Sequence, residues 1–306
     1  MKEIKVFAPA SVANVGPGYD TFGFAIKKLG DLITVKKRND ERLNILPAIG
    51  AELPTKPEEN VAGVAIQSLL KALQSKQGFD IQIEKMFRPG SGLGSSASSA
   101  VGAVYAVNQL LGNPLSTMQL LPFALDGEAL ASKCYHADNV APALLGGFQA
   151  VRSYEPLELF SITDIDDLHV LIIFPDVEIK TAIAKELLPK KLSIKDAREQ
   201  WGNVAALIHA LHTKDYKLLS RSITDRIAEP FRKNLIPEYD RVKQIAVESG
   251  SVGFNISGSG PSMFALFTDE SLAENCKARV SKLYGEISLP VLFNISKINS
   301  TGCEII

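Results

Sequence analysis

One glycine- and serine-rich stretch constrains the fold of this chain more than any other segment. It runs from Arg88 to Ser99 and reads RPGSGLGSSASS. The residues before it, Phe79–Phe87, alternate like a strand with one buried face, and the residues after it, Ser96–Leu111, have the composition of a helix that ends at Gly112. Glycines let a backbone approach an anion closely, and the N-terminus of a helix adds a positive end. The sequence therefore predicts a strand, a phosphate-binding loop and a helix.

The spacing of the glycines excludes two common phosphate loops. No G-x-x-x-x-G-K-[ST] pattern occurs in the chain, so the stretch is not a Walker loop. Gly90, Gly92 and Gly94 fall at every second residue, which does not match the G-x-G-x-x-G spacing of dinucleotide-binding folds. Local context alone also allows a glycine-rich turn that binds no ligand.

Three motifs, spread over most of the chain, carry a family resemblance. The stretch GLGSSA at residues 92–97 resembles the central motif of the GHMP small-molecule kinases. The stretch PASVANVGPGYD at residues 9–20 is similar to the first motif of that family in its homoserine kinase branch, and ISGSGPS at residues 256–262 resembles the third. Arg88 departs from the pattern, because the family usually has proline there.

The order of predicted elements and the resemblance agree on an α+β fold. The elements do not alternate regularly as βαβ units, which favours antiparallel or mixed sheets. The resemblance implies a two-lobed GHMP kinase fold, with a ribosomal-S5-like N-terminal lobe and a ferredoxin-like C-terminal lobe around a shared cleft. We expect an N-terminal domain with the ATP loop over residues 1–165 and a C-terminal domain over residues 166–306. The polar run Tyr154–Asp167, which contains Asp164 and Asp166, is the expected connection.

Hydrophobic periodicity predicts the individual elements. The expected strands are Ile4–Ala8, Leu32–Lys37, Phe79–Phe87, Gly147–Ser153, Leu168–Phe174, Ser262–Phe267 and Val291–Ile298. The expected helices are Val61–Gln74, Ser96–Leu111, Met118–Ala131, Ala182–Leu187, Asp196–His212, Asp215–Ile227, Ile236–Ser249 and Leu272–Tyr284.

Composition excludes several classes of partner. With 33 basic and 34 acidic residues among 306, the net charge is −1, so nothing directs the chain toward nucleic acid or an anionic membrane. No run of about 18 apolar residues is present, and the start Met-Lys-Glu-Ile-Lys lacks the apolar core of a signal peptide. We therefore expect a cytoplasmic protein whose partners are small molecules, with no nucleic-acid or membrane partner.

The cysteines and histidines do not predict a soft metal site. Cys134, Cys276 and Cys303 are widely separated and form no C-x-x-C pattern, so they are expected to be ordinary thiols. The histidines show no zinc-ligand spacing. Any metal site should therefore be rich in oxygen ligands.

The resemblance implies ATP and Mg²⁺ as cofactors. Magnesium takes one or two protein oxygens besides phosphate oxygens, and the resemblance gives this role to Ser96 and Glu128, which we also count as catalytic. Taken alone, Glu128 is more typical of a solvated carboxylate on a helix, and the resemblance reverses that preference. Asn60 either lies near the adenine or caps the helix that begins at Val61, and we favour the cap. The expected nucleotide-binding residues are Asn60, Pro89, Gly90, Ser91, Gly92, Leu93, Gly94, Ser95, Ser96, Ala97 and Ser98.

The resemblance also implies L-homoserine as the acceptor. The positions that hold homoserine in that branch correspond here to Asn14, Asp20, His136 and Asn139, whose amide and carboxylate groups can orient an amine and a hydroxyl without charge mismatch. The positions that bind its carboxylate correspond to Thr181, Lys185 and Arg232. Lys185 stands where the branch usually has arginine, and a lysine fixes carboxylate geometry less tightly than a planar guanidinium. Taken alone, Lys185 also fits an exposed lysine on a short helix.

Asn139 bears on the question of a catalytic base. In mevalonate-type relatives an aspartate at the similar place acts as general base, whereas an asparagine cannot accept a proton in that way. Because the transition state of phosphoryl transfer is loose, positioning and electrostatics can suffice without a base. Asp138 as the base is the alternative. Before the resemblance is considered, Asp138 and Asn139 also fit a helix cap or a turn.

The sequence thus predicts an ATP-dependent phosphorylation of the homoserine hydroxyl, in threonine biosynthesis. The resemblance suggests a homodimer. Two alternatives stay open: a GHMP kinase that acts on another small alcohol, and a non-catalytic, metabolite-sensing pseudokinase built on the same fold.

Overall fold

The computed structural model describes residues 1–162, 165 and 167–306 of the chain, and its mixed order of helices and strands confirms the expected α+β class. The strands are β1 (Glu3–Ala13), β2 (Phe22–Lys37), β3 (Leu43–Ile45), β4 (Phe79–Lys85), β5 (Phe148–Tyr154), β6 (Leu157–Ile162), β7 (His169–Pro175), β8 (Gly253–Ile256), β9 (Met263–Phe267), β10 (Val291–Lys297) and β11 (Glu304–Ile305). The α-helices are α1 (Val61–Ala72), α2 (Ser95–Leu110), α3 (Leu121–Ser132), α4 (Ala137–Leu145), α5 (Thr181–Glu186), α6 (Ile194–Thr213), α7 (Tyr216–Ser222), α8 (Glu229–Arg232), α9 (Tyr239–Glu248) and α10 (Glu270–Glu286). Short 3-10 helices lie at Pro57–Glu59, Thr117–Leu120 and Lys233–Leu235.

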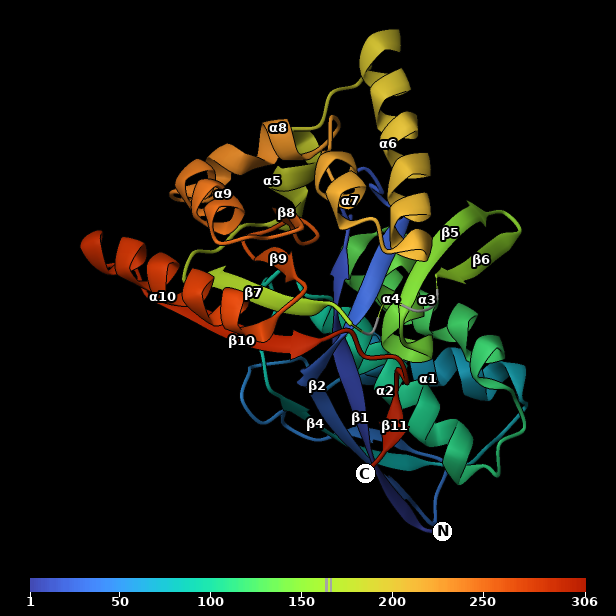
Figure 1. The fold of residues 1–306 in the computed structure, drawn as a ribbon. Helices are drawn as coiled ribbons and strands as arrows, with labels where there is room; N and C mark the ends of the chain where they lie inside the picture. Colours follow the sequence, from blue (N-terminus) through green and yellow to red (C-terminus); the bar gives the residue numbers. More distant parts are fainter. Residues whose placement is uncertain (163–164, 166) are drawn as a thin grey trace.

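Two sheets organise the described part of the chain (Figure 1). The larger sheet has seven strands: its main path runs β11-β1-β2-β4-β3, and β5 joins β2 and carries β6 at its outer side. The smaller sheet has four strands in the order β10-β7-β9-β8, all paired antiparallel. The chain returns to the first sheet at its end, where β11 pairs with β1 beside the N-terminus. The expected domain division at residues 165 and 166 remains a prediction.

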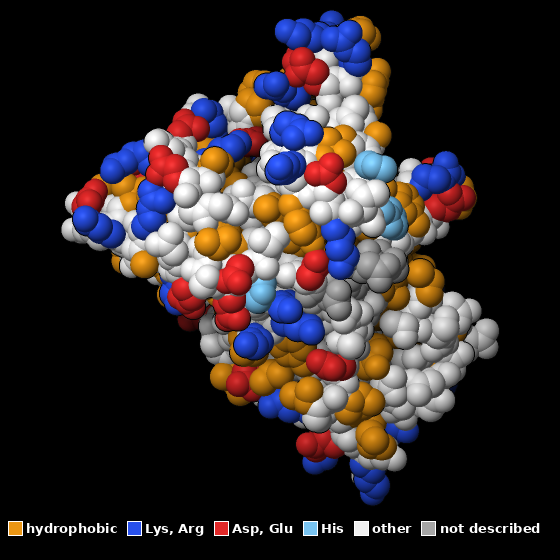
Figure 2. Space-filling model, viewed as in Figure 1, with side chains coloured by type: hydrophobic (Ala, Val, Ile, Leu, Met, Phe, Trp, Pro, Cys, Tyr) orange, Lys and Arg blue, Asp and Glu red, His pale blue; other side chains and the backbone are white. Residues whose placement is uncertain are grey.

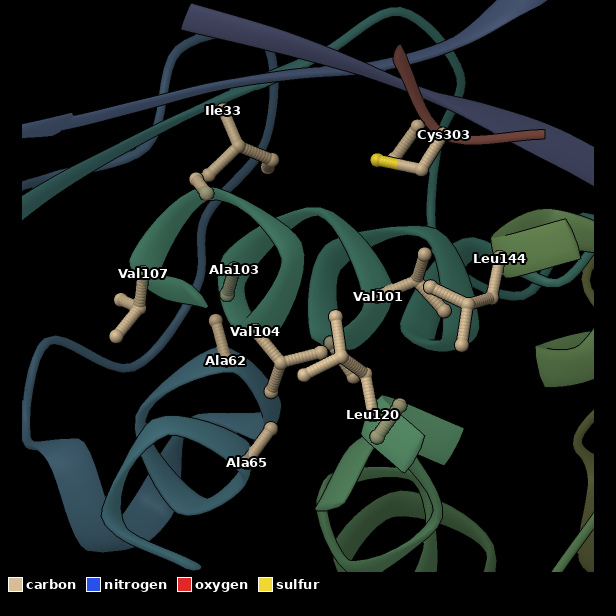
Figure 3. Packing of buried hydrophobic residues seen from close by; sticks show 14 of the residues in the cluster. Ile33, Ala62, Ala65, Val101, Ala103, Val104, Val107, Leu120, Leu144 and Cys303 are labelled. Carbon is tan, nitrogen blue, oxygen red and sulfur yellow. The ribbon is translucent and has the colours of Figure 1, made fainter. Parts of the chain in front are cut away.

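Helix α2 forms the centre of the N-terminal core (Figure 3). Its sequence is rich in small and branched apolar residues, and nearly all of its residues are buried. Val101, Val104 and Val107 pack there with Ala62 and Ala65 of α1, and Ile33 of β2 lies against the same helix. Burial of apolar surface on this scale is the main favourable term in folding, so the helix that follows the glycine-rich stretch is firmly fixed.

Aromatic side chains join the two sheets. Phe24 of β2 stacks on Phe148 of β5 with ring centroids 6.0 Å apart, and its ring meets Phe264 of β9 edge-on at 5.7 Å. These rings belong to one buried cluster that also includes Leu207 of α6. A separate cluster fills the space between the smaller sheet and α9 and α10. The cluster that contains the three aromatic rings includes residues of both sheets. It also includes Leu93, so it fixes the glycine-rich stretch between the sheets.

Several elements differ from the sequence-based expectations. The polar run Tyr154–Asp167 was expected to be only a connection, which is wrong: Leu157–Ile162 forms β6 and pairs with β5. Half-buried and exposed residues follow one another along β6, as in an edge strand. The polar residues of the run hide this strand in the sequence. Asp164 and Asp166 of the expected connection lie outside the described residues.

Two helices also begin or end elsewhere than expected. The helix predicted over residues 215–227 ends at Ser222, because Asp225 turns its carboxylate to the backbone amides of Ile227, Ala228 and Glu229. The helix predicted from Ile236 begins at Tyr239, since Glu238 has a left-handed backbone with φ of 60°. Helix α4 is absent from the expected elements, because Pro142 and its short length hide the helical pattern.

The surface carries no broad field of one charge on the face shown in Figure 2. Acidic and basic side chains are interspersed there, and basic ones gather mainly at the protruding end of α6. No helix among the described residues is both long and apolar enough to span a membrane. Cys276 and Cys303 are buried in the cores, and Cys134 is exposed.

Candidate active site

A hollow of about 250 Å³ brings the three sequence motifs together. It lies where the glycine-rich stretch meets β1, α3, α4, α5 and α8. Its lining includes most of the expected site residues: Asn14, Asp20, Pro89, Gly90, Ser91, Gly92, Gly94, Ser95, Ser96, Glu128, His136, Asn139, Thr181, Lys185 and Arg232. Tyr19, Ala131, Asp138, Gly258 and Ser259 complete it. Residues that are far apart in the sequence therefore face one space.

The glycine-rich loop has the predicted position between β4 and α2, so the expected strand, loop and helix are confirmed. Gly92 and Gly94 have φ of +79° and +67°, in the left-handed region. A Cβ at Gly92 would lie 2.6 Å from the carbonyl oxygen of Ser257, and one at Gly94 would lie 2.2 Å from Ser11 Oγ. Glycine is therefore required twice, once where the loop meets the third motif and once where it meets the first.

Direct hydrogen bonds fasten the loop to both of these motifs. Ser257 Oγ donates to the carbonyl oxygen of Gly92 at 2.7 Å, and Ser262 N donates to that of Ser91 at 3.2 Å. On the other side, Ser11 N donates to the carbonyl oxygen of Leu93 at 3.1 Å. The third motif and the first motif therefore both lie directly against the loop.

The serines of the loop have different surroundings. Ser91 lines the hollow, and its hydroxyl has no hydrogen-bond partner among the described residues. Ser98 is fully buried and donates to the carbonyl oxygen of Pro9 at 2.8 Å. Leu93 and Ala97 are likewise buried in the cores and do not line the hollow. These three residues support the loop from beneath, while Ser91, Ser95 and Ser96 face the space.

Glu128 on α3 lies next to Ser96 in the wall of the hollow. Its side chain is only 5% exposed, which argues against a solvated surface carboxylate. Burial raises the pKa of Glu128, whereas the hydrogen bond with Ser96 and the positive charges of His136 and Lys185 act in the opposite direction. A buried carboxylate beside a hydroxyl, next to a glycine-rich loop, is an oxygen-rich donor set that suits Mg²⁺.

An acidic cluster lies at another wall of the hollow. His136 Nδ1 is 2.8 Å from Asp20 Oδ1, and ligand atoms of Asp20, His136 and Asp138 all lie within 4.8 Å of one another. Burial and the neighbouring Asp20 carboxylate raise the pKa of Asp138 to about 7. Burial alone would lower the pKa of His136, but the hydrogen bond to Asp20 and the charge of Asp138 raise it above its usual value. The wall is therefore suited to a cationic group.

Asn139 lies between the loop and the acidic cluster, in the first turn of α4. Its Oδ1 accepts a hydrogen bond from Ser11 Oγ at 2.9 Å, and the same oxygen lies where a Cβ at Gly94 would be 2.7 Å away. The amide is thus fixed in orientation by the first motif. Asp138 and Asn139 lie inside the first turn of α4, whose N-cap is His136, so the alternative of a cap or a turn is wrong, and both residues line the hollow.

Arg232 supplies a buried positive charge to the same hollow as the acidic cluster. Its side chain donates to the carbonyl oxygens of Ala184 and Gly258 at 3.1 and 2.9 Å, and it lies over the ring of Tyr19 at 5.4 Å. The residue is only 3% exposed, and no described carboxylate forms an ion pair with it. Buried charges are normally paired, so this guanidinium is suited to an anionic ligand.

A second hollow of about 260 Å³ adjoins the first and shares Pro89, Ser95, Ser96 and Ala131 with it. Asn60 lines it, and Asn60 Oδ1 also accepts from Ala62 N at 2.9 Å, so the expected helix cap is confirmed. The residue also borders a space beside the glycine-rich loop, and its position near the adenine stays a prediction.

Sequence reasoning missed several residues of the site. Tyr19 is part of the quoted first motif, but it was not assigned a role; its ring contact with Arg232 could not be read from the sequence. Gly258 and Ser259 are part of the quoted third motif, but they were not assigned a role either. Arg88, the departure from the family pattern, forms an ion pair with Asp176 and lies over Phe174 at 5.0 Å. It thereby ties the start of the glycine-rich loop to the end of β7.

Comparison of the chain with known protein families identifies its family. Residues 60–147 match the N-terminal domain of GHMP kinases, and residues 207–286 match the C-terminal domain of GHMP kinases. The fold and the site therefore define a small-molecule kinase, and the chain belongs to the GHMP kinase family.

Individual relatives of the chain give more detail than the family match. A homoserine kinase of Chlorobium phaeobacteroides strain BS1 is 41% identical over 286 residues, which cover 89% of each protein. A homoserine kinase of Chloroherpeton thalassium is 39% identical over 300 residues, which cover 94% of each. The crystal structure of homoserine kinase from Cytophaga hutchinsonii matches with a TM-score of 0.97 at 42% identity, covering 100% of this chain and 98% of that one.

Proposed function

We propose that this chain transfers the terminal phosphoryl group of ATP to the side-chain hydroxyl of L-homoserine. The products are ADP and O-phospho-L-homoserine, an intermediate for threonine biosynthesis. The near-full-length similarity to homoserine kinases supports this assignment over the two alternatives. The cytoplasmic location and the homodimer expected from the sequence stay predictions.

One observation carries the choice of acceptor: charges of both signs line the same hollow. Arg232 is a buried cation without a carboxylate partner among the described residues, and Asp20 and Asp138 lie in the acidic cluster. Homoserine carries a carboxylate and an ammonium on one carbon, with the hydroxyl two carbons away. We assign the carboxylate to Arg232 and Thr181, with Lys185 as a second cation, and the ammonium to Asp20 with Asn14 and His136.

The loop residues Pro89 to Ser98 form the nucleotide site of the proposal. Backbone amides near Gly90, Gly92 and Gly94, together with the N-terminus of α2, suit the negative charge of a triphosphate. The Ser91 hydroxyl without a partner fits a phosphate oxygen. The adjoining hollow beside Asn60 gives the adenosine a place to extend.

Ser96 and Glu128 fit the metal that accompanies ATP. Their hydrogen-bonded oxygens, of which that of Glu128 is buried, would hold Mg²⁺, which neutralises charge on the phosphates when it is bound. Because burial raises the pKa of Glu128, keeping its carboxylate ionised without a nearby cation costs free energy. A bound cation in this place would favour the ionised form.

Asn139 orients the reacting hydroxyl in this proposal, and no residue needs to remove its proton early. The Ser11 contact fixes the amide between the loop and the acceptor wall. Transition states of phosphoryl transfer are loose, so in-line positioning and charge stabilisation provide most of the rate. Asp138 is buried and accepts a hydrogen bond from the backbone of Asn14, which suits charge balance better than proton abstraction.

The proposal is tested by identifying the product. Purified protein is mixed with ATP, Mg²⁺ and L-homoserine, and the mixture is followed by phosphorus NMR and mass spectrometry. We expect stoichiometric ADP and O-phospho-homoserine. ATP consumption without a phosphorylated amino acid, or no consumption with any alcohol, would refute the proposal, and the second result would favour the pseudokinase alternative.

A further inference from the structure

A buried ion pair beneath the phosphate loop is not used by the mechanism above. Lys85 is the last residue of β4, and Asp31 lies directly opposite it in β2. The two side chains are 1% and 0% exposed, and Lys85 Nζ is 2.5 Å from Asp31 Oδ2. The pair lies on the side of the sheet that α2 covers.

Both members of the pair bind the first turn of α2. Lys85 Nζ donates to the carbonyl oxygen of Ser95 at 2.8 Å and to Ser99 Oγ at 3.2 Å, and Ser99 Oγ donates to Asp31 Oδ2 at 2.8 Å. An ammonium has three N–H bonds, so these acceptors use them all. The pair therefore holds the residue before Ser96 and a residue one turn later.

Stability of the fold does not explain why such a pair is present. Burial raises the pKa of Asp31 and lowers that of Lys85, so each charge is held only by its partners. Asp31 Oδ1 has no hydrogen-bond partner among the described residues. A cation at the N-terminus of a helix also opposes the helix dipole. Well-packed apolar residues in place of a buried ion pair often leave a protein equally stable or more stable.

The position of the pair suggests its purpose. Lys85, Ser95, Ser96 and Ser99 all border the second hollow, and Ser96 is the residue that hydrogen-bonds Glu128. Fixing the peptide before Ser96 fixes where its hydroxyl points. We propose that Asp31 and Lys85 are positioning residues that hold the first turn of α2 in place for the nucleotide and its metal. The inference rests on the proposed function, because it assigns these ligands to the Ser96 side of the site.

The main test replaces the pair by apolar residues of similar size, Asp31→Leu with Lys85→Met. Thermal unfolding and calorimetric binding of ADP with Mg²⁺ are measured on the full chain. We expect an unfolding temperature at or above that of wild type and a nucleotide affinity about 10- to 100-fold weaker, as for other supports of metal ligands. The Michaelis constant for homoserine at saturating ATP should stay close to the wild-type value. Wild-type nucleotide affinity in the double variant would overturn the proposal.

A milder pair of variants keeps the proposal testable if the double variant does not fold. Ser99→Ala removes a buried hydroxyl that contacts the ion pair. Ser222→Ala removes a buried hydroxyl in α7 that, within the described part of the chain, bonds only carbonyl oxygens of its own helix. We expect weaker binding of ADP with Mg²⁺ only in Ser99→Ala. Equal nucleotide affinities in the two variants would contradict a positioning role.

Nucleotide binding, measured beside homoserine phosphorylation, also distinguishes failure of this inference from failure of the proposed function. A wild-type chain that binds ADP with Mg²⁺ but does not phosphorylate homoserine would refute the proposed function. Nucleotide affinity that is the same in wild type and in all these variants would refute the positioning role instead.

Discussion

Asn14 and Arg232 donate hydrogen bonds to one acceptor, the carbonyl oxygen of Gly258, at 3.1 and 2.9 Å. Asn14 follows β1, Arg232 ends α8, and Gly258 belongs to the third motif. Asn14 Oδ1 in turn accepts from the backbone amide of Asp20 at 2.7 Å. The cationic and acidic walls of the hollow are therefore fixed relative to each other through one backbone oxygen.

This connection makes Arg232 the sharpest test of acceptor recognition. Arg232→Ala also removes contacts within the protein, so its effect must be compared between substrates. We expect a loss in kcat/KM for homoserine at least about tenfold larger than for homoserinol, because homoserinol has no carboxylate to leave unpaired. Steady-state kinetics with both alcohols on wild type and variant measure the difference. Equal losses would rule out carboxylate recognition by Arg232.

Glu128 tests the metal site. Replacing it with alanine should lower kcat by roughly 10²–10³, the effect of losing one preorganised charge-stabilising group. Binding of the nucleotide should survive in part, since the loop amides remain. Glu274→Ala, on the exposed face of α10, is the matched control and should behave as wild type. Turnover near the wild-type level in Glu128→Ala would show that the metal is held elsewhere.

Asn139 and Asp138 test catalysis without a base. Asn139→Leu should lower kcat more than Asp138→Asn does, because the leucine loses the polar contact that orients the hydroxyl, whereas the asparagine keeps a polar group of the same shape. The kcat values are compared at saturating ATP and homoserine, with circular dichroism to verify folding. A collapse of kcat confined to Asp138→Asn would mean that Asp138 is the base after all.

The pKa of Asp138 predicts how stability depends on pH. The folded-state pKa of about 7 lies above the ordinary value of 3.8, so burial favours the protonated form. The protonated carboxyl contributes its full stability below about pH 4, and that contribution declines as the pH rises toward 7. Asp138→Asn lacks this decline. Between pH 4 and 7, thermal unfolding should therefore show wild type losing stability relative to Asp138→Asn, with a constant difference above about pH 8. A difference that does not change over this range would contradict the assignment.

The sequence predicted the parts of the site that are local. The alternation of Phe79–Phe87, the glycines and the composition of α2 were sufficient for the strand, loop and helix, because each depends on neighbours in the chain. The cap at Asn60 is local in the same way. The family resemblance supplied the rest, and the structure brings Glu128, Asn139 and Arg232 into one hollow.

What the sequence did not reveal depends on contacts over long distances along the chain. The Tyr19 ring meets Arg232, and Arg88 meets Asp176, only after the two sheets have packed together. Strand β6 was missed because it lies in a polar run and itself contains the exposed polar residues Glu158 and Ser161, as edge strands often do. Asp31 directly precedes the expected strand Leu32–Lys37, and Lys85 lies within the expected strand Phe79–Phe87. Only their register beneath α2 shows that they form a pair.

The central claim is that this chain phosphorylates homoserine in preference to other small alcohols. The most direct measurement is kcat/KM for a panel that includes homoserine, homoserinol, 4-hydroxybutyrate and mevalonate, with ATP and Mg²⁺ held constant. We predict that homoserine has the highest kcat/KM of the panel. The values for homoserinol and 4-hydroxybutyrate should each be at least about tenfold lower, because each alcohol leaves one charged group of the hollow without its opposite charge. A higher kcat/KM for mevalonate or for either truncated alcohol than for homoserine would contradict the account.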